Sequence, residues 1–159
     1  MVLELVSLKN ISLLSGTAYL LIFITGIYAN FTVLEPMIFW ESPEKTYRIL
    51  NENTGKFQNA VWAFGLMLAL DLFLVWGLYR LFLHADKKRA FAASILRFVN
   101  VVFFVVAWLE LVRVSDLIGR TGQEVESAAI SVMDLLSKFD SIWLAGLVFF
   151  VLYLVLLSA

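Results

Sequence analysis

The chain contains no cysteine and only one histidine, and these shortages exclude several kinds of site. Without cysteine there is no disulfide, no zinc–thiolate or iron–sulfur site and no cysteine nucleophile. Because His84 is the single histidine, one chain cannot build a multi-histidine metal site or a bis-histidine haem site. Charge is also scarce: charged residues make up 16% of the 159 residues, and the net charge of −1 gives no strong field toward nucleic acid. We therefore expect no metal, no cofactor and no nucleic-acid partner.

Hydrophobic residues are abundant, at 62% of the sequence with a mean hydropathy of +0.89. Soluble domains are only about 45–50% apolar, and one small core cannot bury this excess while its surface stays wettable. A membrane-spanning helix needs about 20 mostly apolar residues. Four segments qualify, at residues 11–34, 60–83, 90–112 and 141–159. The sequence predicts an all-α integral membrane bundle of four transmembrane helices, forming a single domain over residues 1–159.

Loops one and three are each predicted to contain a short amphipathic helix. In loop one, Ser42-Pro43-Glu44 is typical of a helix start, with Ser as N-cap, Pro at the first helical position and an acid in the first turn. We expect this helix to lie on the membrane. In loop three, apolar residues recur at helical spacing, namely Val125, Ala128, Ala129, Val132, Leu135, Leu136 and Phe139. That helix is expected on the bilayer or over the mouth of the bundle.

Loop two is short and basic, and it predicts the orientation of the chain. Lys87, Lys88 and Arg89 follow one another there, whereas the other two loops balance their basic residues with acids. Basic residues are enriched in short cytoplasmic loops. We therefore expect a protein of the plasma membrane with loop two and both termini in the cytoplasm. The first segment is expected to be kept as a helix, because it is too long and its start is not basic enough for a signal peptide.

Three polar residues lie well inside the second and third spans. Asp71 is near the middle of the second span, and Arg97 and Asn100 enter the third span from the same side. At about 1.5 Å per residue, Asp71 and Asn100 share nearly one depth, and Arg97 is about 6 Å shallower. Because a charge at mid-bilayer costs about 2.5–3.5 kcal/mol, we expect an Asp71–Arg97 ion pair with Asn100 as its hydrogen-bonding neighbour. Glu110 and Arg113 are three residues apart and are expected to pair at the outer end of the third span.

Several short motifs follow one another along nearly the whole chain. They are Gly16-Thr17-Ala18-Tyr19-Leu20-Leu21 with Gly26, then Asp71, Leu78-Tyr79-Arg80-Leu81, Leu96-Arg97-Phe98 and Gly146-Leu147-Val148-Phe149-Phe150. Their order and spacing resemble the domain-of-unknown-function family 4386, a group of polytopic membrane proteins. The resemblance implies a membrane protein and no established activity. Because such proteins typically continue through further helices, this chain is expected to be a short version or to share its bundle with a partner.

The Asp71–Arg97 pair leaves two main interpretations of function. A buried ion pair between neighbouring helices often fixes which helices pack together, without transport or chemistry. We therefore expect a non-enzymatic scaffold or accessory subunit of a membrane assembly, in contact with lipid, other membrane subunits or itself. The alternative is a small transporter or a ligand- or lipid-binding protein that uses Asp71, Arg97 and Asn100. A membrane enzyme ranks last, since paired carboxylates, a histidine cluster and an activated nucleophile are missing.

Overall fold

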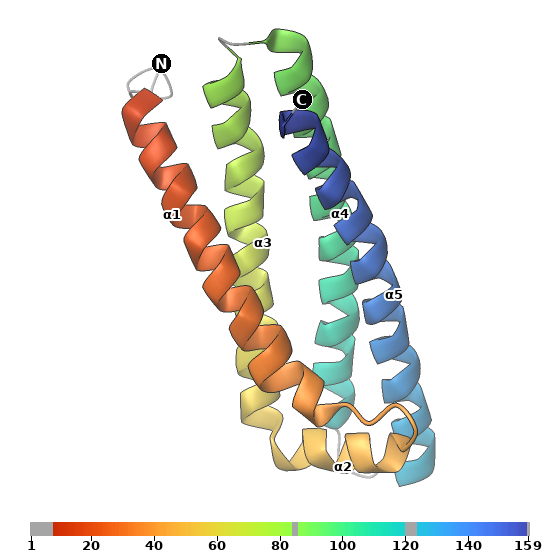
Figure 1. Ribbon diagram of the computed structural model, residues 1–159. Coiled ribbons are helices and arrows are strands. Elements are labelled where there is room, and N and C mark those ends of the chain that lie inside the picture. Colours follow the sequence, from red (N-terminus) through yellow and green to blue (C-terminus); the bar gives the residue numbers. More distant parts are fainter. Residues whose placement is uncertain (1–7, 84–85, 120–123, 159) are drawn as a thin grey trace.

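The computed structural model describes residues 8–83, 86–119 and 124–158, and every element in these ranges is a helix (Figure 1). Four helical stretches are long and apolar enough to cross a membrane. The first consists of α1 (Leu8–Ile27), the π-helix η2 (Tyr28–Leu34) and the 3₁₀-helix η3 (Glu35–Met37), and the others are α3 (Thr54–Phe82), α4 (Lys87–Ile118) and α5 (Val125–Ser158). The short helix α2 (Pro43–Glu52) connects the first stretch to α3. The predicted all-α fold with four candidate spans is confirmed.

The long helices run side by side, and the two ends of the bundle differ (Figure 1). The start of α1, the end of α3, the start of α4 and the end of α5 lie at one end, whereas α2 lies across the other, which we call the α2 end. Along the bundle α1 packs on α3, α3 packs on α4, and α4 packs on α5. Among the described residues the backbones of α1 and α5 do not approach one another closely, so the bundle is open along that side.

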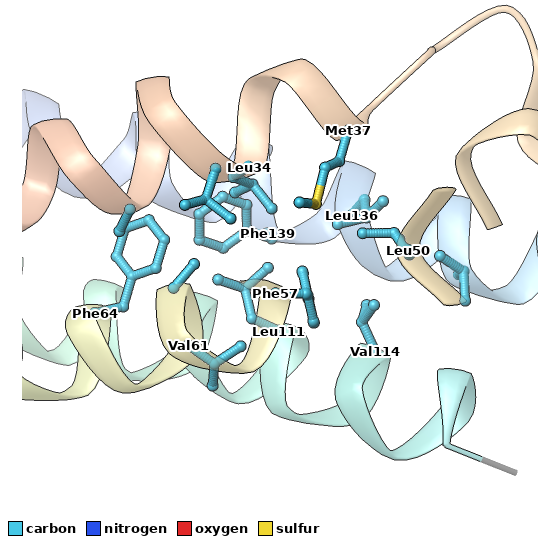
Figure 2. Packing of buried hydrophobic residues seen from close by; sticks show 14 of the residues in the cluster. Leu34, Met37, Leu50, Phe57, Val61, Phe64, Leu111, Val114, Leu136 and Phe139 are labelled. Atoms are coloured by element: carbon cyan, nitrogen blue, oxygen red, sulfur yellow. The ribbon is translucent and has the colours of Figure 1, made fainter. Parts of the chain in front are cut away.

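A hydrophobic core fills the α2 end (Figure 2). Leu34 of η2, Leu50 of α2, Phe57 of α3, Leu111 of α4 and Leu136 of α5 are all buried and belong to one cluster. Burying a leucine or phenylalanine side chain stabilises a soluble protein by roughly 1.5–3 kcal/mol. Because Leu50 lies inside this cluster, α2 packs against the end of the bundle rather than only on a surrounding bilayer.

The turn that leads into α2 is fixed by a threonine. α2 begins at Pro43, where the sequence predicts a helix start, and Ser42 holds the N-cap position without a capping hydrogen bond from its side chain. The buried Thr46 hydroxyl instead accepts from the N–H of Phe39 at 2.8 Å and donates to the carbonyl of Phe39 at 3.1 Å. This pair of bonds holds the extended segment before α2 against its first turn.

Loop three differs from its prediction. The residues expected to form a separate amphipathic helix belong to α5 and continue without a break into the fourth span. Neither glycine nor proline occurs between Val125 and Trp143, so nothing in this stretch ends a helix. Of the seven residues predicted to form its apolar face, Ala128, Ala129, Val132, Leu136 and Phe139 are buried, whereas Leu135 is half-buried and Val125 is exposed. The loop-three helix and the last span are therefore one helix.

The first span is not a uniform α-helix. In η2 the pitch widens, and the N–H of Glu35 donates to the carbonyl of Asn30, five residues earlier. Pro36 follows directly; it has no N–H, and a proline ring clashes with the carbonyl four residues before it. A regular α-helix therefore cannot run through this point. The sequence pattern does not predict the π-helix, a feature that occurs frequently at functional sites.

Candidate functional site

Four polar side chains, one from each of the long helices, form one network inside the bundle. The Nη2 atom of Arg97 (α4) donates to Oδ1 of Asp71 (α3) at 2.5 Å, and its Nη1 atom donates to the hydroxyl of Tyr19 (α1) at 2.9 Å. The Tyr19 hydroxyl lies 2.6 Å from the hydroxyl of Tyr153 on α5. Arg97 and Asp71 are 1% and 3% exposed, so the pair is shielded from both lipid and water.

Aromatic rings surround the Arg97 guanidinium. Its central carbon lies 4.9 Å from the ring centroid of Tyr19, 5.0 Å from that of Tyr153 and 5.8 Å from that of Phe150. A guanidinium within about 6 Å of a ring centroid is attracted by the ring's negative face. The Asp71 carboxylate and these rings together stabilise the positive charge of Arg97 inside the bundle.

Little empty space remains beside this network. The hollow next to Arg97 and Tyr153 is lined mainly by apolar side chains of α3 and α4 and is too narrow to admit a water molecule. Two polar atoms in this layer nevertheless lack a hydrogen-bond partner among the described residues, namely Nε of Arg97 and Oδ1 of Asn100. Asp71 and Arg97 are therefore enclosed by the bundle, and these two atoms could each still form a hydrogen bond.

Asn100 does not join the ion pair. Its Nδ2 atom donates to the carbonyl of Gly146 at 2.9 Å and so connects α4 to α5. The close approach depends on glycine, because a Cβ atom at Gly146 would lie 2.7 Å from a ring carbon of Phe104. The structure thus separates the three predicted residues into an Asp71–Arg97 pair between α3 and α4 and an Asn100–Gly146 contact between α4 and α5.

The structure also brings Glu110 and Arg113 together at the α2 end of α4. The Nη1 atom of Arg113 lies 2.8 Å and 3.0 Å from the two carboxylate oxygens of Glu110. Glu110 is buried whereas the Arg113 side chain is 63% exposed. Arg113 thus supplies the counter-charge that a buried carboxylate needs. Within the part of the chain that the structure describes, no three His, Cys, Asp or Glu side chains gather into a metal-binding group.

Sequence reasoning missed the two tyrosines of the network. Tyr19 stands among several polar residues of the first segment, and Tyr153 stands alone in an apolar run near the C-terminus. A buried tyrosine hydroxyl usually finds a hydrogen-bond partner. Each tyrosine inside an apolar span was therefore a signal for a partner, although the sequence could not say which one.

Comparison with known proteins identifies a family and no activity. Residues 14–159, nearly the whole chain, match the sequence family described as Domain of unknown function (DUF4386). No curated protein and no solved structure matches the chain. The resemblance found from the motifs is confirmed, and function has to be argued from the geometry.

Proposed function

Since the chain belongs to the DUF4386 family, whose description assigns no activity, we propose from its geometry that it is a non-enzymatic scaffold or accessory subunit of a membrane assembly. It would lie in the plasma membrane with both termini in the cytoplasm, as the basic loop two predicts. The observation that carries the proposal is the closed state of the network. The polar side chains of the network, namely Tyr19, Asp71, Arg97 and Tyr153, are directed at one another rather than at an open site.

A transporter or receptor needs a polar site that a ligand can reach. Here both terminal nitrogens of Arg97 are used, one by Asp71 and one by Tyr19, and the adjacent hollow excludes water. Buried polar pairs of this kind fix which helices pack together and at what depth. This supports a role for Asp71 and Arg97 in holding the bundle together.

The outer faces of α1 and α5 support the assembly role. In the most apolar part of each, only 17% of the residues are buried, against 39% in α3 and α4. Both helices expose large apolar side chains, such as Leu13 and Phe23 of α1 and Leu144 and Val148 of α5. These faces are available to lipid or to other membrane subunits.

The proposal is tested by extracting the protein gently from its own membrane and weighing the complexes by native mass spectrometry. A scaffold appears with other subunits or with itself. The double variant Asp71→Leu/Arg97→Met should give the same complexes, because a buried pair replaced by apolar residues is often neutral or stabilising. A clean monomer in mild detergent would contradict the assembly role.

The second candidate is a small transporter or ligand-binding protein centred on Asp71, Arg97 and Asn100. The partnerless Arg97 Nε and Asn100 Oδ1 favour it, because a ligand that displaced neighbouring side chains would satisfy both atoms. In that case the purified wild type should retain a defined small mass. Asn100→Ala should lose this mass while remaining folded, with a free energy of unfolding lower by about 0.6 kcal/mol because the hydrogen bond to the Gly146 carbonyl is lost. If the wild type carries no such mass, this candidate is rejected.

A further inference from the structure

A second polar region lies at the α2 end, where a pocket of about 400 Å³ opens between the end of the first span and α5. Asn30, Phe31, Glu35 and Trp40 line it from one side, and Phe139 and Asp140 line it from the other. None of these residues belongs to the Asp71–Arg97 network. The pocket therefore needs an explanation of its own.

The π-helix builds one wall of this pocket. Because the N–H of Glu35 bonds the carbonyl of Asn30, five residues earlier, the widened turn stacks these two residues along the helix. Both side chains line the pocket, as does Phe31. The chain then turns at Ile38, whose backbone is extended, and brings Trp40 to the same opening. The irregular end of the first span thus gathers one amide, one carboxylate and two aromatic rings.

The chemical character of the pocket is aromatic and acidic. Its inner part is apolar, because Leu136 and Phe139 are buried, while Glu35 and Asp140 are exposed near the opening. No basic side chain lines it, and within the described ranges neither carboxylate forms an ion pair. Trp40 is 53% exposed, so its ring is free to meet a ligand.

The surrounding charge has the same sign. The described residues 35–59, 110–119 and 124–140, which form the loops and helix ends on this side, contain ten acidic and five basic residues. Their net charge of −5 raises the local concentration of cations and lowers that of anions. The long-range field and the pocket lining therefore favour the same kind of ligand.

We propose that this pocket binds an alkylammonium group. Aromatic rings together with carboxylates are the combination that recognises such cations, since the ring faces attract the charge and also accept the methyl or methylene groups. The pocket lies at the end of an apolar span, so the ammonium can come from a zwitterionic phospholipid headgroup or from a free amine in solution. An anionic headgroup finds two carboxylates and no basic side chain in this lining.

The lipid source is tested with the full chain in nanodiscs that contain equal amounts of phosphatidylethanolamine and phosphatidylglycerol. Native mass spectrometry of the released protein measures the ratio of the two lipids that stay bound. The wild type should retain phosphatidylethanolamine preferentially, and Glu35→Gln/Asp140→Asn should reduce the preference roughly tenfold. The matched control Glu52→Gln/Glu126→Gln removes two exposed carboxylates from the same end of the bundle without touching the pocket. It should keep the preference.

The soluble source is tested by calorimetric titration of tetramethylammonium chloride into the protein in dodecyl maltoside, with sodium chloride as the reference salt. Trp40→Leu should weaken whichever binding is observed, that of lipid or that of tetramethylammonium. The control Trp62→Leu removes an exposed ring outside the pocket and should leave this binding unchanged. Lipid preference alone identifies a headgroup, and tetramethylammonium binding alone identifies a free amine. The proposal is overturned if neither is found, or if the two control variants lose as much binding as the two pocket variants.

Discussion

Gly146→Ala is the substitution whose effect the structure defines best. The added Cβ atom would lie 2.7 Å and 2.8 Å from two ring carbons of Phe104 and 3.1 Å from the Cβ atom of Phe103. The Phe104 ring cannot turn away easily, because it stacks on Trp143 with centroids 3.9 Å apart. To accept the methyl group, α5 must move away from α4, and that movement stretches the hydrogen bond from Asn100 to the Gly146 carbonyl.

The size of the effect follows from three terms. Overpacking a tight contact costs about 1–3 kcal/mol. An interhelical hydrogen bond in a membrane protein contributes about 0.6 kcal/mol. Alanine is favoured over glycine inside a helix by about 1 kcal/mol, which opposes the other two terms. We expect Gly146→Ala to lower the free energy of unfolding by about 2 kcal/mol, since the clash involves a stacked ring rather than a flexible side chain.

The assay is equilibrium unfolding in mixed detergent micelles, followed by circular dichroism. Gly16→Ala is the matched control, because Gly16 lies inside α1 and nothing lies within 4 Å of a Cβ atom built there. It should be neutral or stabilising. In a double-mutant cycle, Gly146→Ala should cost less when Phe104 is replaced by leucine. Equal stability of the Gly146→Ala and Gly16→Ala variants would refute the packing argument.

Three further predictions concern the network, a second glycine and the orientation. Asp71→Leu alone should destabilise by about 3–5 kcal/mol, because it leaves Arg97 buried without its carboxylate, whereas Asp71→Leu/Arg97→Met should unfold near the wild-type denaturant concentration. Wild-type behaviour of the single variant would show that the pair contributes nothing. Gly77→Ala should separate α3 from α1, since its Cβ atom would lie 2.8 Å from Oγ of Ser15, and Ser15→Ala should restore the loss of stability. The chain has no cysteine, so single cysteines at Lys88 and Asn51 report orientation directly: an impermeant maleimide added to intact cells should label the second and not the first.

Depth and helical rotation explain what the sequence predicts within the network. Asp71 and Arg97 lie in consecutive spans joined by a short turn and differ in depth by only about 6 Å, which the long arginine side chain can cover, so the rise per residue predicts that they can meet. Asn100 stands at a suitable depth too, but three residues at about 100° each turn it some 60° away from Arg97 around α4. The rotation directs it to Gly146 on α5. The depth of a residue in the membrane can be predicted from one sequence. Which helix its side chain faces depends on how the helices are arranged around it, and the sequence alone does not show this arrangement.

Helix boundaries show a related difference between composition and structure. The predicted fourth span begins at Ser141 because Asp140 is the last charged residue before it. The last charged residue shows where the apolar, lipid-facing stretch begins, and a helix can begin well before that point. α5 extends back to Val125, since exposed charged side chains such as Asp134 and Lys138 pair along its outer face without interrupting it. The π-helix before Pro36 was missed because apolar periodicity over one wide turn resembles that of an ordinary helix.

The bond between the Tyr19 and Tyr153 hydroxyls has a consequence for how the protein is made. The Asp71–Arg97 pair joins residues 26 apart, in helices that leave the ribosome one after the other, whereas Tyr19 and Tyr153 are 134 residues apart. An unpaired charge costs about 2.5–3.5 kcal/mol at the centre of a membrane, so insertion of α3 and α4 as a paired hairpin is favoured. Until α5 enters, the Tyr19 hydroxyl has only Arg97 beside it. Formation of the tyrosine pair then joins α1 to α5 through their side chains and marks the moment when all four long helices are in place.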